Sequence, residues 1–318
     1  MRGKNCILLA AAGLLVLGLG AGGADERPLL FTAIDSPGVI AYTYTNIDFP
    51  GARITFAFGL NERAAIVGNY VDSSFARHAF LLSEGVFSTI DPPGGTNDNS
   101  ANNINNRGRI VGQYVDSGGI YHGFLLSGGV FTTIDVPGAV HSFANGINDR
   151  GQIVGDYLDS AGGDHGFLLS NGAFTTIDPP GGTDSLASDI NDRGQIVGYY
   201  LDSGGVFHGY LLSRGAFTTI DFPGAVHTLL YGNNEKGEIV GFYVTDTNVN
   251  KSTAQHAFLL SFGSFVTVDP PGWTGRSIAA GINNQGQIAG LFRDAAGRHG
   301  FLATPVDDAG HEDERIQP

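Results

Sequence analysis

Cysteine, methionine and tryptophan are almost absent from this sequence. Each occurs once among 318 residues, whereas glycine occurs 49 times. The one cysteine, Cys6, lies near the N-terminus, so a chain processed beyond it would have no disulfide and would depend on packing and backbone pairing. The many glycines indicate tight turns, and the core must be built from Ile, Val, Leu, Phe and Tyr. This composition favours β structure.

Basic residues are also scarce. Lys and Arg number 17 against 31 Asp and Glu, and the formal net charge at pH 7 is −14. Nucleic acids and anionic membranes are bound through basic surfaces, so neither is expected as a partner.

Long apolar runs are confined to the N-terminus. Arg2 and Lys4 precede 14 mostly apolar residues, Cys6 to Leu19, and small residues follow up to Ala24. This order is typical of a secretory signal peptide at residues 1–24, and the run is shorter than the roughly 20 residues of a membrane-spanning helix. We therefore expect a secreted, extracellular protein, with the periplasm and the cell surface as alternatives, and no membrane span once the leader is removed.

A short motif recurs six times along the chain. Its copies begin 44, 43, 43, 43 and 49 residues apart, and the last interval is longer because VTDTNVNKSTAQ is inserted at residues 244–255. A fixed period of this length is the signature of a repeat architecture. The copies are GLNERAAIVG at 59, NINNRGRIVG at 103, GINDRGQIVG at 146, DINDRGQIVG at 189, GNNEKGEIVG at 232 and GINNQGQIAG at 281.

Each unit contains four short segments separated by turn residues. In residues 182–224 the segments are SLASDIN, QIVGYYLD, HGYLLS and AFTTID, and the breaks DRG, SGG, RG and FPG supply the backbone angles of turns. The segments are rich in β-branched and aromatic residues, which predicts four antiparallel strands per unit. Because such a sheet is apolar on both faces, it needs a neighbour on each side. Six units therefore predict an all-β, six-bladed β-propeller.

The two ends of the repeat region complement one another. The sixth unit stops before its last segment, and AYTYTNIDFPG at residues 41–51 supplies a matching segment ahead of the first unit. We predict that residues 41–48 form the outer strand of the blade completed by residues 278–303. This pairing would close a monomeric propeller over residues 41–305 and cover strand edges that could otherwise aggregate.

The remaining segments fall outside the propeller. FTAIDSPG at residue 31 belongs to an N-terminal segment, residues 25–40, and is expected to add an extra strand or to lie on the surface. Residues 306–318 are acidic and contain almost no bulky apolar side chains, so we expect a solvated, disordered tail.

Two motifs recur in phase across the units. HAF occurs at residues 78–80 and 256–258, HGF or HGY occurs in the other four units, and each is accompanied by a GINxxGQIVG-like segment. In both motifs, residues 41–303 resemble the HAF family of extracellular repeats. The resemblance implies a secreted bacterial protein with a propeller-like fold, and it supplies no catalytic residues.

Histidine recurs at the start of the third segment of every unit. Equivalent residues in successive blades are rotated by about 60°, so six histidines cannot converge on one ion unless they lie near the axis. We expect each to hydrogen-bond a loop carbonyl or the aspartate before it, as in Asp202 with His208. The histidines are His78, His122, His165, His208, His256 and His299.

Aspartate recurs after the fourth segment of all six units and after the second segment of five of them. Calcium takes six to eight oxygens, often several from one loop, whereas DSGG and DPPG turns offer one carboxylate each. These aspartates are expected to bond their own backbone, and no cofactor is predicted. Calcium stays an alternative, with TNDNSANN at residues 96–103 as its best local candidate.

The positions at which the units differ are the best candidates for function. No catalytic motif occurs in the required context, and a working site needs different residues in different roles. The clearest variable position lies in the loop before the innermost strand of each blade, where the first unit has Ile54, and Trp273 lies in the same loop of the last unit. We predict that these residues rim one mouth of the channel and bind a glycan or a peptide. The predicted binding residues are Asp98, His141, Asp184, His227, Trp273 and Arg276.

The sequence therefore favours a secreted, non-catalytic binding or scaffolding module. One alternative is an extracellular carbohydrate-active hydrolase or lyase that uses Asp98, Asp184, His141 and His227. A purely structural surface or matrix protein is the other. An axial pocket with two carboxylates about 5 to 10 Å apart would favour the enzyme, and a plugged channel would favour binding or structure.

Overall fold

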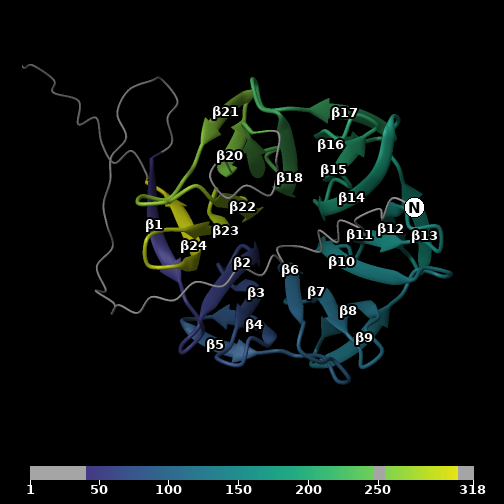
Figure 1. The fold of residues 1–318 in the computed structure, drawn as a ribbon, viewed down its shortest axis with the longest axis horizontal. Helices are drawn as coiled ribbons and strands as arrows, with labels where there is room; N and C mark the ends of the chain where they lie inside the picture. The colour runs from purple at the N-terminus through teal and green to yellow at the C-terminus, as the bar shows by residue number, and fades with distance from the viewer. Residues whose placement is uncertain (1–40, 247–254, 307–318) are drawn as a thin grey trace, which may run out of the picture.

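A computed structural model describes residues 41–246 and 255–306. The described residues form six four-stranded antiparallel sheets arranged around an axis, which confirms the predicted six-bladed β-propeller (Figure 1). The predicted signal peptide, the segment 25–40, most of the tail and residues 247–254 of the insertion lie outside the described residues. Within the described residues, no helix is long and apolar enough to cross a membrane.

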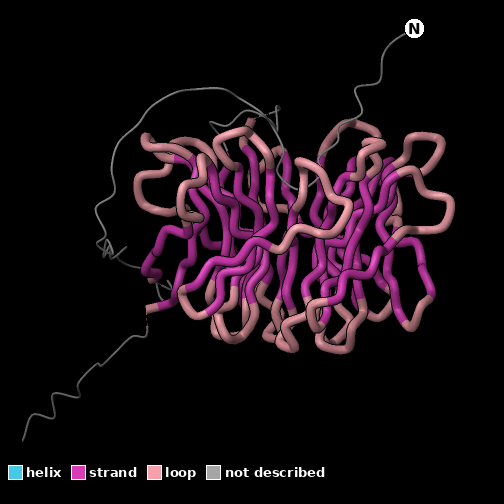
Figure 2. Tube along the Cα trace, turned by 90° about the horizontal axis from the view of Figure 1, so that it is seen from below, coloured by secondary structure: helices cyan, strands magenta, loops and turns pink. Residues whose placement is uncertain are grey.

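In each blade the four strands follow one another from the axis outwards, and the loops gather at the two ends of the ring (Figure 2). The first blade has β2 (Ile54–Leu60), β3 (Ile66–Val71), β4 (Arg77–Ser83) and β5 (Val86–Thr89). The second has β6 (Ser100–Ile104), β7 (Ile110–Val115), β8 (Tyr121–Ser127) and β9 (Val130–Ile134), and the third has β10 (His141–Ile147), β11 (Ile153–Leu158), β12 (Asp164–Ser170) and β13 (Ala173–Ile177). The fourth has β14 (Gly182–Ile190), β15 (Ile196–Asp202), β16 (Phe207–Ser213) and β17 (Ala216–Ile220), and the fifth has β18 (His227–Asn233), β19 (Ile239–Val244), β20 (Gln255–Ser261) and β21 (Ser264–Thr267).

The sixth blade is assembled from both ends of the described chain. Its inner strands are β22 (Ser277–Ile282), β23 (Ile288–Arg293) and β24 (Arg298–Pro305), and its outer strand is β1 (Tyr42–Ile47). β1 pairs with β24 in antiparallel register from Tyr42 opposite Pro305 to Ile47 opposite Gly300. The predicted closure by residues 41–48 is confirmed.

The two recurring motifs meet inside each blade. The glycine of IVG on the second strand lies directly opposite the aromatic residue of HAF, HGF or HGY on the third strand, as Gly112 lies opposite Phe124. A Cβ atom at Gly112 would lie 2.8 Å from the Phe124 ring and 2.0 Å from the Ser100 carbonyl oxygen. Only glycine leaves room for the ring, so the two motifs recur together. The rings are fully buried between blades and belong to Phe80, Phe124, Phe167, Tyr210, Phe258 and Phe301.

A ring of six asparagines joins the blades where the innermost strands end. Each Nδ2 donates a hydrogen bond to the backbone carbonyl of the equivalent asparagine in the next blade, at 2.9 to 3.3 Å. The last of these bonds runs from Asn283 to Asn61 and closes the circle. Each Oδ1 also accepts N–H groups of its own turn, as Asn191 does from Arg193 and Gln195. This asparagine ring consists of Asn61, Asn105, Asn148, Asn191, Asn234 and Asn283.

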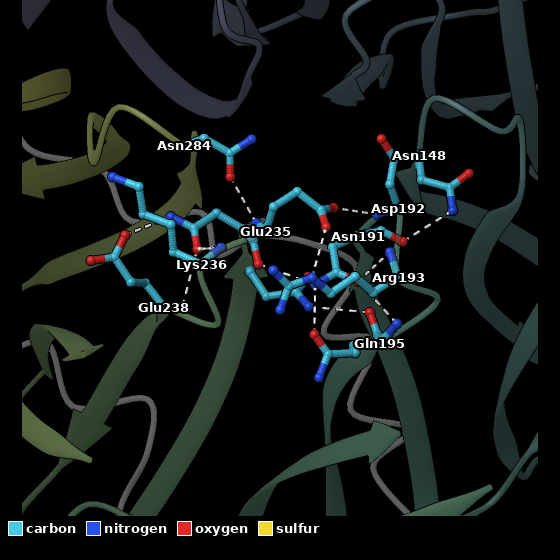
Figure 3. A network of polar contacts seen from close by, with 11 residues as sticks. Asn148, Asn191, Asp192, Arg193, Gln195, Glu235, Lys236, Glu238 and Asn284 are labelled. Carbon is cyan, nitrogen blue, oxygen red and sulfur yellow. Dashed lines mark hydrogen bonds and ion pairs between the residues drawn. The ribbon is translucent and has the colours of Figure 1, made fainter. Parts of the chain in front are cut away.

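A second closed circle lies next to the first. The residue after each asparagine donates its backbone N–H to a side-chain oxygen of its counterpart in the next blade. Figure 3 shows this circle passing from Asp192 to Glu235 and on to Asn284, beside the bond from Asn148 to Asn191. This outer polar ring consists of Glu62, Asn106, Asp149, Asp192, Glu235 and Asn284.

We expect Ile47→Ala to destabilise the protein by about 2 to 5 kcal/mol, because it removes a buried side chain from the junction between the sixth and first blades. Ile134→Ala is the matched control, since Ile134 occupies the equivalent position in the second blade with similar burial. Chemical denaturation of both variants would measure the loss. A negligible loss for Ile47→Ala beside a large loss for Ile134→Ala would contradict closure by β1.

Replacing Asn148 by alanine should lower the free energy of unfolding by about 2 kcal/mol or more. The variant leaves the Gln152 N–H without its hydrogen-bond partner, at a cost of about 1 to 3 kcal/mol, and it removes the interblade bond to the Asn191 carbonyl, which keeps only the Gly194 N–H. Asn97→Ala, at an exposed loop position, is the control and should change stability by less than about 0.5 kcal/mol. Equal effects of the two substitutions would argue against the asparagine ring.

Candidate functional site

The variable residues before the innermost strands lie at equivalent positions at one end of the ring. Apart from Ile54, each contacts the start of the third strand of the preceding blade. Asp98 forms an ion pair with Arg77 and accepts a hydrogen bond from the Tyr121 hydroxyl at 2.7 Å. These five residues therefore connect neighbouring blades. We refer to the set as the rim: Ile54, Asp98, His141, Asp184, His227 and Arg276.

The two rim histidines act as hydrogen-bond acceptors between blades. His141 Nδ1 accepts the Tyr121 N–H at 3.2 Å, and His227 Nδ1 accepts the Phe207 N–H at 3.1 Å. Burial lowers the pKa of His141, which is consistent with a neutral ring. His227 is buried, so its ring is closed to direct contact with a large ligand.

The two rim carboxylates have different surroundings. Asp98 is neutralised by Arg77, whereas Asp184 accepts the backbone N–H of another acid, Asp164, at 3.3 Å. Burial and the charge of Asp184 raise the pKa of Asp164 to about 6. The seam between the third and fourth blades is therefore the acidic part of the rim.

Trp273 lies in a seam rather than over the mouth. Its half-buried side chain packs against the core between the fifth and sixth blades. Its ring lies edge-on to His256, with centroids 4.7 Å apart. The structure thus shows an interblade packing role for Trp273, and its predicted ligand contact stays a prediction.

The six recurrent histidines form hydrogen bonds with aspartates of the turns. Each Nδ1 lies 2.5 to 3.1 Å from the aspartate after the fourth strand, and five of the six Nε2 atoms lie 3.4 to 3.5 Å from the aspartate after the second strand. His208 Nε2 lies 3.5 Å from the expected partner, Asp202, but the short hydrogen bond of this histidine is to Asp221, at 2.8 Å. At the closure, the hydrogen bond to Asp48 raises the pKa of His299. These histidines are structural, and residues 41–246 and 255–306 hold no cluster of three His, Cys, Asp or Glu side chains suited to a metal ion.

The axis is closed partway along its length. Asn103 Nδ2 of the second blade donates to Asp189 Oδ1 of the fourth blade at 2.9 Å, across the third blade. Asp189 also accepts the backbone N–H groups of Ile190 and Asn233, at 2.9 and 3.1 Å. Glycine at the same level lets the strands approach, since a Cβ on Gly146 would lie 2.7 Å from the Asp189 Cα. We call the Asn103–Asp189 bridge the plug.

A cavity of about 50 Å³ lies on the rim side of the plug. Its polar lining, which we call the polar wall, comes from the second to fourth blades: Asn102, Asn103, Gln113, Asn145, Asp156 and Ser188. Its aromatic and apolar lining, which we call the aromatic wall, comes from the first blade and the third to sixth blades: Phe58, Phe143, Leu186, Tyr199, Tyr231 and Ala280. We call this space the axial cavity.

The polar wall is a hydrogen-bonded chain of side chains. Asn102 Nδ2 donates to Gln113 Oε1 at 2.8 Å, and Asn145 Nδ2 donates to Asp156 Oδ1 at 2.7 Å. Asp156 is only 6% exposed, and burial raises the pKa of its carboxyl to about 8. Near pH 7 this wall therefore carries a protonated acid able to donate or accept a hydrogen bond.

The opposite mouth is a wider funnel of about 80 Å³. It is lined by the asparagine ring and the outer polar ring. The carboxylates there, at Glu62, Asp149, Asp192 and Glu235, each accept a backbone N–H of the preceding blade in the ring. The polar residues of this mouth therefore serve the interactions that hold the blades together.

The sequence analysis missed the residues that line the axial cavity. The position after the glycine of IVG alternates with core positions and was interpreted with them, yet it varies strongly. It holds Asn69, Gln113, Asp156, Tyr199, Phe242 and Leu291 in successive blades, so that polar residues occupy the first three blades and apolar residues the last three. This difference between the first three and the last three blades was the signal that the sequence offered for the cavity residues.

Comparisons with known proteins identify the fold. No protein-family model and no curated protein sequence matches this chain. A solved structure assigned as TolB from Agrobacterium tumefaciens is similar, with a TM-score of 0.57 and 14% identity over 80% of this chain and 91% of that one. AofleA from Arthrobotrys oligospora has a TM-score of 0.52 and 11% identity over 82% of this chain and 86% of that one. At such low identity these likenesses show the fold alone.

The free energy of unfolding should respond to Asp156→Asn in a pH-dependent way. The folded pKa of about 8 lies above the unfolded value of about 3.9, so the folded state holds a proton that the unfolded state releases. The contribution of Asp156 to stability is therefore present at low pH and is lost as the pH rises towards 8. Asn carries no such charge, and the variant should gain stability relative to wild type between pH 5 and pH 8.

Thermal or urea unfolding at several pH values tests this expectation. The difference between variant and wild type isolates Asp156 from the other groups that titrate in the same range. A difference that stays constant from pH 5 to pH 8 would contradict the raised pKa of Asp156.

Proposed function

We propose that the protein is a secreted binding module that takes a small polar ligand into the axial cavity from the rim. The observation that carries the proposal is the division of this cavity into a polar wall and an aromatic wall. Binding sites for small molecules combine apolar surface with a few convergent polar groups in this way. The resemblance to the HAF repeats and the leader-like N-terminus support a secreted protein, and a peptide or a glycan is the proposed ligand.

The size of the cavity limits what can enter it. A cavity of about 150 Å³ accepts a benzene molecule, whereas the axial cavity measures about 50 Å³. A compact end group of the ligand fits, and the rest of the ligand would extend past the rim. In this arrangement Asn102, Gln113 and Asp156 bond the polar atoms of the end group while Tyr199 and Tyr231 cover its apolar face.

Two observations favour binding over a hydrolase or a lyase. The plug prevents a substrate chain from threading the axis. The side chains considered for acid and base roles are engaged between blades, as Asp98 is with Arg77 and His141 is with the Tyr121 N–H. Catalysis by Asp98, Asp184, His141 and His227 would require these contacts to be given up.

A glycan and peptide screen with wild type and Ala280→Leu tests the proposal. Ala280 lines the axial cavity, and leucine would fill part of it without disturbing the outer surface. Ligands found with wild type should bind the variant at least about tenfold more weakly, while its melting temperature stays within a few degrees of wild type. Phe262→Ala, at a 99% exposed position, is the control and should bind normally.

In the same screen, Trp273→Ala tests whether Trp273 packs between blades or contacts the ligand. If Trp273 only packs between blades, the variant should lose stability and keep its affinity for the ligand. A selective loss of affinity would instead support ligand contact by Trp273. Ligands that bind Ala280→Leu as well as wild type would refute the axial cavity as the site, and no ligand at all would favour a structural role.

A further inference from the structure

Asp156 is an acid whose presence the fold does not require. The equivalent positions in the other blades hold two amides, two aromatic residues and a leucine. Its one described hydrogen bond comes from Asn145, and it forms no ion pair with any described residue. By contrast, Asp189, the other buried acid at the axis, accepts three hydrogen bonds and holds the plug. Burying a carboxyl without a cationic partner is costly, so a role outside folding is indicated.

A second charge of opposite sign lies in the same part of the molecule. Arg276 is a rim residue on the strand segment that continues to Ile278 and Ala280, and both of these pack with the aromatic wall. Among the described residues, its buried Nε has no hydrogen-bond partner and its guanidinium forms no ion pair. Burial, together with the nearby Arg298, lowers the pKa of Arg276 to about 10.

Tyr231 connects the two charges. It lines the axial cavity, and burial raises the pKa of its hydroxyl; the hydrogen bond with Tyr199 and the charge of Arg276 act to lower this pKa, and the charge of Asp156 acts to raise it. The acid and the guanidinium therefore act on one tyrosine from different blades, the third and the sixth. The acidic side also includes Asp164, which lies close enough to raise the pKa of Asp156.

We propose that the axial cavity and the rim above it bind a small zwitterion, with its ammonium group against Asp156 and its carboxylate against Arg276. This inference rests on the proposed binding function and names the chemical class of the ligand: a free amino acid or a short peptide with free termini. The ammonium group would lie against the buried carboxyl of Asp156, and the carboxylate would lie against the partly buried guanidinium of Arg276. A guanidinium suits a carboxylate, and the rings of Tyr199 and Tyr231 suit an ammonium group.

Binding of an ammonium group should release a proton. In the empty cavity the raised pKa of about 8 keeps Asp156 largely protonated at pH 7, and a neighbouring cation favours the ionised carboxylate. The titratable groups that interact with Asp156 are Asp164 on β12, Tyr199 on β15, Tyr210 on β16 and Tyr231 on β18. Of these, Asp164 also has a pKa near the working range, so its variant must be measured separately.

Isothermal titration calorimetry with L-alanine, its dipeptide and its tripeptide tests the proposal. Each is measured free, N-acetylated and C-amidated, at pH 7 in two buffers of different ionisation enthalpy. We expect one free ligand length to bind at least about tenfold more tightly than either blocked form, with release of a proton that disappears in Asp156→Asn and persists in Asp164→Asn. The fold-change corresponds to one charge-assisted hydrogen bond.

The variants identify which protein group recognises which end of the ligand. In Asp156→Asn, N-acetylation of the ligand should no longer weaken binding, and in Arg276→Gln, C-amidation should no longer weaken it. Glu84→Gln, at an exposed turn, should change neither effect. Melting temperatures show whether each variant is folded. The ratio of the affinities for the free and the blocked ligand, measured within one variant, is independent of that variant's overall affinity.

Free ligands that bind no better than their blocked forms would overturn the inference. If neutral sugars or blocked peptides then bind wild type and lose affinity in Ala280→Leu, the proposed binding function stands and only the ligand class is wrong. If nothing binds the axial cavity, both proposals fail. A preference for the free over the N-acetylated ligand that persists in Asp156→Asn would also overturn the assignment of the ammonium site.

Discussion

The asparagine ring is the interaction on which the rest of this structure depends. Each side-chain amide bonds the backbone of the next blade, and its oxygen simultaneously holds its own turn, so the spacing between blades and the exit of every innermost strand are set together. Because the sixth link returns from Asn283 to Asn61, the chain of interblade bonds has no open end. Together with the pairing of β1 and β24, the ring closes the wheel at both its inner and its outer margin without using a disulfide.

Because the ring is closed in this way, the residues that face the axis can differ from blade to blade. When the blades are held by repeated contacts at the turns and by aromatic rings packed on glycine, the residues facing the axis do not have to be alike. Asp189 is used to plug the axis, and its three hydrogen bonds compensate its burial. Among the described residues, Asp156 accepts one hydrogen bond and Arg276 forms no ion pair, and we propose that this difference separates charges that serve the fold from charges available to a ligand.

The repeats made the fold predictable, and they also concealed the site. The blade number, the strands and the closing strand followed from near-identical segments and from one unit that lacked its last strand. The interblade partners of the rim residues were not foreseen, because Arg77 and Tyr121 lie in the preceding unit at a position that the repeat pattern does not single out. The asparagine of the GIN motif was placed at the end of the first segment of its unit, and the bond of its side chain to the next blade was not foreseen. Asp156 was overlooked because it lies within a segment that otherwise reads as core.

Native-state hydrogen exchange at the backbone amides bonded to the asparagine ring tests the central claim most directly. These amides belong to Ala65, Arg109, Gln152, Gln195, Glu238 and Gln287, one in each blade. If the ring is closed and cooperative, all six should exchange through global unfolding with the same free energy, including Ala65 and Gln287 on either side of the junction. Exchange at Ala65 and Gln287 through a local opening, at a much lower free energy than at Gln152 and Gln195, would contradict it.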